Sequence, residues 1–145
     1  MKIPPKSKAK EDYIRFLKSL EVDEIYLSET TARFDRDSSK SSTKQVSVHG
    51  RSRFGKPLIS NASFTVPATM EVLIGAPNTK DAFGRIEVTY VLKFSVESKE
   101  LNPEHVNQFT RSTIKVVIWP FFREFIHNMT ARFGIPHVNV PIHAE

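Results

Sequence analysis

Residues 86–96 alternate between apolar and polar side chains with one exception. From Ile86 to Val96 every even position carries an apolar or aromatic side chain, and every odd position is charged or hydroxylated except Val91. Successive side chains of a β-strand point to opposite faces of the sheet, so the alternation predicts a strand with one buried face and one wet face. Strands of parallel sheets are apolar on both faces, and the pattern therefore favours an antiparallel sheet.

Three earlier segments show the same period less regularly, which gives a sheet of four strands. The first begins at Val22 and is expected to place Ile25 and Leu27 on one face and Tyr26 and Phe34 on the other. The second runs from Val46 to Phe54 and the third from Phe64 to Ile74, both with apolar residues at even positions. Pro67 lies in the third, and because proline cannot donate to a ladder it predicts an edge strand or a bulge.

Two helices are expected to flank these strands. A short amphipathic helix is predicted over Glu11–Leu20, following a basic tail of residues 1–9. The second helix is long: Asn102 can cap it, Pro103 suits its first position, and Gly134 ends it.

Pro120 falls in the middle of the long helix. A proline inside a helix removes a backbone hydrogen bond and crowds the preceding turn, so we expect a kink or break near Ile118 and Trp119. The fold class predicted is α+β, with a four-stranded antiparallel sheet covered by this interrupted helix.

The apolar side chains of the long helix cover more of its circumference than one sheet can bury. They span roughly 200° of arc, whereas a helix on a single sheet needs an apolar arc of roughly 100°. The members are Ile114, Val117, Ile118, Trp119, Phe121, Phe122, Phe125, Ile126, Met129 and Phe133. The surplus must contact a second subunit, a bound polypeptide or more of the chain itself.

Composition excludes several classes of protein. With no cysteine, the chain has no thiol catalysis, thiolate metal site or disulfide. No stretch is long and apolar enough to insert into a membrane, so we expect a soluble, cytoplasmic protein whose residues 10–145 form one domain.

One segment of the long helix resembles a known family. The run Trp119-Pro120-Phe121-Phe122-Arg123-Glu124, followed by Gly134-Ile135-Pro136 and an apolar tail, looks like the helix of the SecB-like protein-export chaperones. The resemblance implies a homotetramer, built as a dimer of dimers, that holds non-native polypeptides without ATP. Export members deliver preproteins to the SecA motor, and relatives in toxin–antitoxin systems protect an antitoxin.

The resemblance and the surplus of apolar residues together suggest sites. Candidate client-binding residues are Trp119, Phe121, Phe122, Val138, Val140 and Ile142, and candidate residues of the oligomer interface are Ile114, Ile118, Phe125 and Met129. Typical export members are acidic, and the formal net charge of +5 argues against SecA as a partner.

A basic surface gives the alternative function. His49, Arg51 and Arg53 alternate along the second strand and predict a basic partner surface on its outer face, which fits a nucleic acid or a single acidic partner protein.

No catalytic motif is present, and we expect neither enzymatic activity nor a cofactor. An acid–base enzyme on this fold would need Glu124 or His127 to be buried. His137 and His143 are too weak a pair to predict a metal site.

Overall fold

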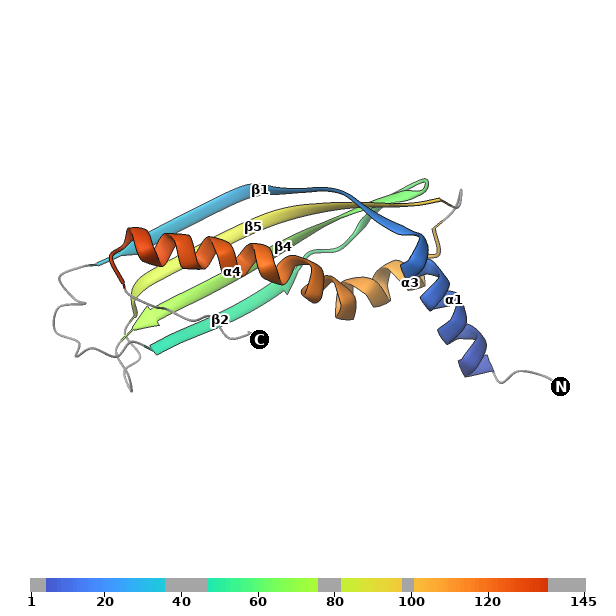
Figure 1. Ribbon diagram of the computed structural model, residues 1–145, viewed down its shortest axis with the longest axis horizontal. Helices are drawn as coiled ribbons and strands as arrows, with labels where there is room; N and C mark the ends of the chain where they lie inside the picture. The colour runs from blue at the N-terminus through green and yellow to red at the C-terminus, as the bar shows by residue number, and fades with distance from the viewer. Residues whose placement is uncertain (1–4, 36–46, 76–81, 98–100, 136–145) are drawn as a thin grey trace.

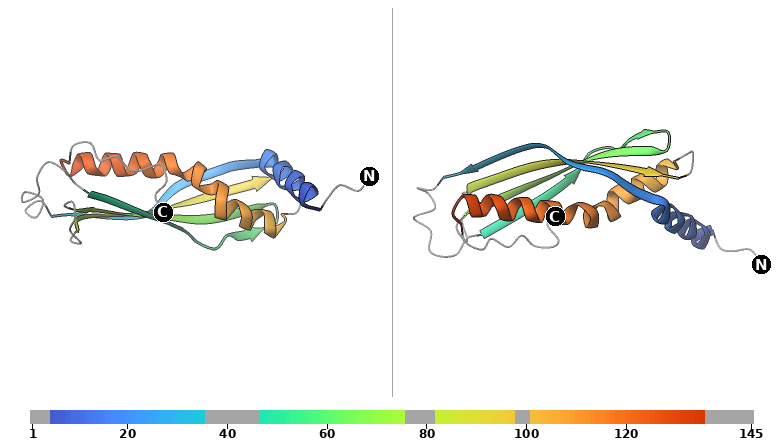
Figure 2. Two further views of the ribbon diagram at one scale, coloured as in Figure 1. Left: turned by 90° about the horizontal axis from the view of Figure 1, so that it is seen from below. Right: turned by 45° about the horizontal axis from the view of Figure 1, so that its top comes forward.

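The computed structural model describes residues 5–35, 47–75, 82–97 and 101–135 and shows an antiparallel sheet with a helical layer on one face (Figure 1). The elements in chain order are α1 (Pro5–Ser19), β1 (Leu20–Phe34), β2 (Ser47–Phe54), β3 (Leu58–Ser60), β4 (Ser63–Gly75), β5 (Ala82–Val96), α3 (Pro103–Gln108), the π-helical turn η1 (Phe109–Thr113) and α4 (Ile114–Arg132). Figure 2 shows α4 lying along the sheet and α1 at one end of it. The predicted α+β class is confirmed.

The described part of the sheet has five strands where four were expected. Its order is β1-β5-β4-β2, and the three-residue strand β3 pairs with β4 beyond the end of β2. β2 and β3 therefore follow one another along the same side of β4. Pro67 is neither on an edge strand nor at a bulge. It lies in the interior strand β4 where β2 has ended and β3 has not begun, so the N–H that proline lacks falls in a break of the neighbouring ladder.

β1 contains two bulges that change which of its side chains face the helices. The register with β5 shifts between Val22 and Glu24 and again between Leu27 and Glu29. Each extra residue reverses the alternation. Phe34 therefore shares the helix-facing side with Ile25 and Leu27, and the prediction that it lies with Tyr26 is wrong.

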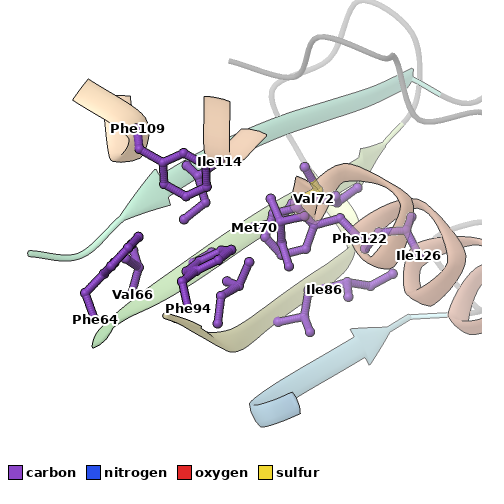
Figure 3. Close-up of a cluster of buried hydrophobic side chains, with 14 of the residues drawn as sticks. Phe64, Val66, Met70, Val72, Ile86, Phe94, Phe109, Ile114, Phe122 and Ile126 are labelled. Atoms are coloured by element: carbon purple, nitrogen blue, oxygen red, sulfur yellow. The ribbon is translucent and has the colours of Figure 1, made fainter. Parts of the chain in front are cut away.

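The core lies between the inner faces of β4 and β5 and the helical layer (Figure 3). Its largest fully buried side chains include Phe64, Met70, Phe94, Phe109, Ile114, Phe122 and Ile126. The alternation predicted for 64–74 and 86–96 is confirmed by this burial.

The long helix is continuous across Pro120, so of the kink or break expected near Ile118 and Trp119 the break does not occur. Pro120 is exposed, and the carbonyl deprived of its partner belongs to the exposed Val116, where water can satisfy it. The irregularity lies earlier, at η1, where the N–H of Ile114 donates to the carbonyl of Phe109 five residues back. This wider turn lets both Phe109 and Ile114 point into the core.

Both ends of the helical segment follow the predicted capping. The Asn102 side chain accepts a hydrogen bond from the backbone N–H of Glu104 at 3.0 Å, and Pro103 occupies the first helical position. At the other end Gly134 has φ of +80°, and the N–H of Ile135 donates to the carbonyl of Thr130. The left-handed conformation of Gly134 ends α4.

α1 begins at Pro5, inside the segment predicted to be a tail and six residues before the expected Glu11. The first turn consequently holds no acidic side chain. Phe16 anchors the helix: it is buried and contacts Phe64 and Phe109, each with ring centroids 6.4 Å away. The Tyr13 hydroxyl also hydrogen-bonds Thr113 Oγ1 at 3.0 Å. α1 is therefore held against the end of the core.

Because Phe16 joins α1 to the core, Phe16→Ala should lower the free energy of unfolding by about 3 kcal/mol. Ile14→Ala is the matched control, since Ile14 lies on the same helix with 40% of its surface exposed. The control should cost less than about 1 kcal/mol. Urea unfolding followed by circular dichroism measures both, and equal losses would contradict the docking role of Phe16.

Candidate functional site

Three rows of side chains along α4 have different surroundings. Side chains four residues apart lie almost directly above one another on a helix. Each such row therefore stays on one side of α4 over the length of the sheet. The row that faces the sheet consists of Ile114, Ile118, Phe122, Ile126 and Thr130, all buried. Ile114 and Ile118, predicted at an oligomer interface, and Phe122, predicted to bind a client, are therefore core residues of the chain itself.

The second row lies on the flank of α4 that faces β1 and β5. It consists of Val117, Phe121, Phe125, Met129 and Phe133, none of them fully buried. Two ring contacts fix its direction: Phe121 meets Tyr90 of β5 with centroids 5.9 Å apart, and Phe133 stacks on Phe34 of β1 at 5.1 Å. The surplus apolar arc of the helix is this row. It includes one of the predicted client-binding residues, Phe121, and two of the predicted interface residues, Phe125 and Met129.

Trp119 belongs to a third row. It is two residues, or about 200° of helical turn, from Phe121, and it points to the opposite flank of α4. The indole is half-buried against the core, and its buried Nε1–H has no hydrogen-bond partner among the residues that the structure describes. The structure thus separates Trp119 from Phe121, with which the sequence grouped it.

β1 supplies apolar side chains beside the second row. The first bulge puts Ile25 and Leu27 on the same, helix-facing side as Val22, yet Val22 stays 51% and Leu27 46% exposed. Leu27 pairs with Tyr90, which in turn contacts Phe121. We call this connected surface the apolar strip; its members are Val22, Ile25, Leu27, Tyr90, Val117, Phe121, Phe125 and Met129.

The strip carries no charge at neutral pH. Its one ionisable member is Tyr90, and burial, with a smaller contribution from the carboxylate of Glu124, raises the pKa of Tyr90 above its ordinary value. The phenol therefore stays protonated. An uncharged, partly aromatic surface favours contact with apolar side chains rather than with ions.

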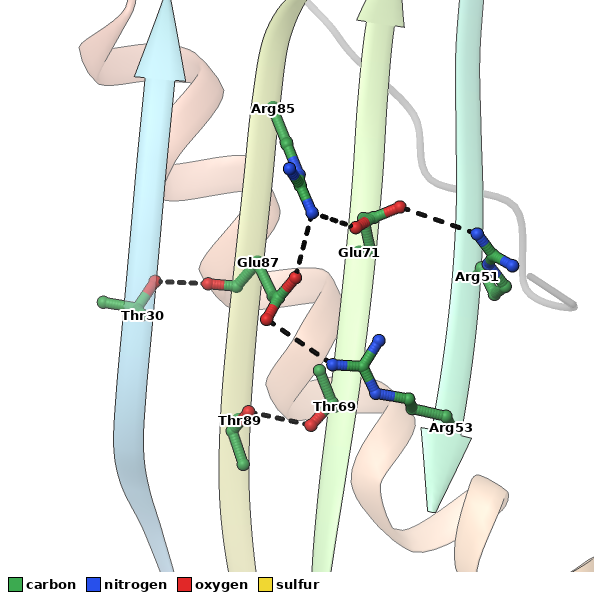
Figure 4. A network of polar contacts seen from close by, with 8 residues as sticks. All are labelled: Thr30, Arg51, Arg53, Thr69, Glu71, Arg85, Glu87 and Thr89. Carbon is green, nitrogen blue, oxygen red and sulfur yellow. Dashed lines mark hydrogen bonds and ion pairs between the residues drawn. The ribbon is translucent and has the colours of Figure 1, made fainter. Parts of the chain in front are cut away.

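The predicted basic residues lie on the other side of the sheet. His49, Arg51 and Arg53 all point to the outer face, as the alternation of β2 predicted. Figure 4 shows the two arginines beside Glu71, Arg85 and Glu87. This basic surface therefore lies on the face of the sheet opposite the apolar strip.

The other predicted positions add no site. Val138, Val140 and Ile142 lie outside the described residues, as do His137 and His143. Glu124 and His127 are exposed, so neither is the buried acid or base that an enzyme on this fold would need. Within the described ranges no three His, Cys, Asp or Glu side chains gather where they could hold a metal ion. No helix there is long and apolar enough to cross a membrane.

Comparison with known proteins gives a structural likeness without a sequence match. The chain matches no family profile and no curated protein sequence. Its structure is similar to that of the Rv1957 SecB-like chaperone of Mycobacterium tuberculosis, solved in complex with a ChAD peptide from the Rv1956 HigA1 antitoxin. The TM-score is 0.73 at 15% sequence identity, and the match covers 94% of this chain and 99% of the other. The chain has the fold of a SecB-like chaperone.

Proposed function

We propose that the protein is an ATP-independent chaperone that binds non-native polypeptide segments on the apolar strip. The observation that carries the proposal is the exposure of the strip: α4 covers β4 and β5, whereas Leu27 and Phe121 stay 46% and 36% exposed beside Tyr90. Contiguous apolar surface of this kind on a folded chain is typical of an interaction site.

The composition of the strip suits clients of varied sequence. Aromatic and branched side chains contribute area without requiring one partner shape, and each apolar client side chain gains about 1.5–3 kcal/mol when fully buried. β1 is also an edge strand of the described sheet, so backbone donors and acceptors lie next to Leu27. An extended client segment could pair with that edge while its side chains enter the strip.

The SecB-like chaperone of similar fold was solved with an antitoxin peptide, which supports a polypeptide as the ligand. We propose that the clients of this protein are of the same chemical kind, either an antitoxin or another chain before folding or export. The formal net charge of +5 keeps SecA the weaker of the proposed partners.

Binding of an unfolded client should depend on the apolar strip more than on exposed apolar side chains elsewhere on the protein. We expect the double variant Leu27→Ser/Phe121→Ser to bind an unfolded client about tenfold more weakly, because two apolar contacts are lost. The measurement is suppression of light scattering when a chemically unfolded protein is diluted into buffer without ATP.

The matched control is Leu58→Ser on β3, whose side chain is 71% exposed and points to the outer face of the sheet. It should suppress scattering as well as the unaltered protein does. Equal suppression by the double variant, with its fold intact by circular dichroism, would refute the strip as the client site.

We further propose that the protein forms a homotetramer, with α4 contributing to the interface. Val116 supports this: it is the most exposed large apolar side chain of the described residues and lies on the side of α4 away from the sheet. Phe125 and Met129, half-buried members of the apolar strip, remain candidates for the interface as well as for client contact. Ile114 and Ile118 are buried in the core of the chain and are no longer candidates.

A charge in place of Val116 should weaken association between copies. Val116→Lys is expected to reduce the mass measured by light scattering after size-exclusion chromatography, because the lysine ammonium would have to be desolvated at the interface. Lys115→Glu, one residue away on an already charged position, serves as the control. An unchanged mass for Val116→Lys would remove this face of α4 from the interface.

A further inference from the structure

The outer face of the sheet, opposite the helical layer, has an uneven distribution of charge. Arg51 and Arg53 of β2 and Arg85 of β5 gather at one side, and Arg33 of β1 lies directly opposite Arg85 in the register. Beyond Arg33, the outer face of β1 carries Thr31 and Tyr26 together with the acidic Glu29, Glu24 and Glu21. The arginines therefore form one basic area rather than a band across the sheet.

The basic area retains hydrogen-bond donors that its own carboxylates do not use (Figure 4). Arg85 makes the short contacts, at 2.6 Å to Glu71 and 3.3 Å to Glu87. Arg51 and Arg53 stand farther from their glutamates, at 3.9 and 3.6 Å, and their side chains are 76% and 66% exposed. Three guanidinium groups thus surround two carboxylates, and the two outer ones are held loosely.

Arg33 extends the positive charge to the end of the sheet. Like charges directly opposite one another on paired strands repel, and Arg33 has no ion pair within the described residues to offset its position across from Arg85. Both arginines line a depression of about 690 Å³, together with Leu73, Phe83 and Asp35. Asp35 supplies one carboxylate to this depression, and two guanidinium groups line it.

We infer that this outer face is a docking surface for an acidic peptide segment of a partner protein. A guanidinium presents two parallel donors to a carboxylate, and Arg51 and Arg53 are free to do so on the exposed side. Acidic side chains of an extended peptide would contact these two arginines and then Arg33 and Arg85 at the end of the sheet.

The same observations favour a peptide over a nucleic acid. A phosphate backbone needs a continuous cationic track, and here Glu71 and Glu87 lie among the arginines while the acidic part of β1 lies beside them. Tyr26, an aromatic residue of this face, already has the ammonium of Lys93 5.7 Å from its ring centroid, so a base that stacked there would have to displace or share this contact.

This inference does not depend on the chaperone proposal. The basic area and the apolar strip occupy opposite faces of one sheet, so each can be altered separately. Arg51 and Arg53 can also be removed with little cost to the fold, because Arg85 still pairs with both glutamates.

The test is binding of fluorescein-labelled octaglutamate, followed by fluorescence anisotropy near physiological salt. We expect the unaltered protein to bind it at least about tenfold more tightly than octaglutamine, and Arg51→Ser/Arg53→Ser to weaken binding by about tenfold. The matched control, Lys115→Ser/Arg123→Ser, removes the same charge from exposed positions of α4. It should change the affinity by less than about twofold.

Three results would overturn the inference. The first is that octaglutamate binds no better than octaglutamine. The second is an equal loss for the two double variants, which would reduce the effect to net charge. The third is tighter binding of an eight-nucleotide thymidine strand that Arg51→Ser/Arg53→Ser abolishes, which would make the area a nucleic-acid surface. Suppression of client aggregation should be unchanged in this variant, so the two proposals fail independently.

Discussion

The contact of one row of α4 with the inner faces of β4 and β5 determines the rest of the structure. Ile118, Phe122 and Ile126 fill the core, and this fixes the rotation of the helix about its axis. The neighbouring row, which includes Phe121 and Phe125, is then forced to the flank that faces β1, where the end of α4 covers Phe34 but Leu27 stays partly exposed. The apolar strip is a geometric consequence of packing a helix with a wide apolar arc on a sheet broader than itself.

The elements with regular patterns were predictable from the sequence, and the irregular ones were not. Alternation located β4 and β5, and the residues at Asn102 and Gly134 located the ends of the helical segment. The bulges of β1 have no local signature, because one inserted residue in a polar strand leaves the composition unchanged. Ile25 and Leu27 were correctly placed on one face, but Phe34, beyond the second bulge, was placed on the wrong one.

The candidate site was likewise predictable from the sequence only in part. The apolar arc of the long helix was visible from its sequence, but its separation into a buried row and an exposed row depends on where the sheet lies. Phe121 and Phe122 are adjacent in sequence and equally apolar, yet one is exposed and the other is completely buried. Pro120 predicted an interruption that the helix does not have, because its position on the outer side of α4 makes the missing hydrogen bond tolerable. The irregular turn lies instead at η1.

The central claim is that non-native polypeptide lies on the apolar strip, and site-specific photo-crosslinking tests it most directly. A photo-reactive phenylalanine analogue would replace Leu27, or in a separate sample Leu58, and each protein would be irradiated with an unfolded client. The account predicts a crosslink from position 27 and none from position 58, although Leu58 is the more exposed of the two. Crosslinks of equal yield from both positions, or from position 58 alone, would contradict it.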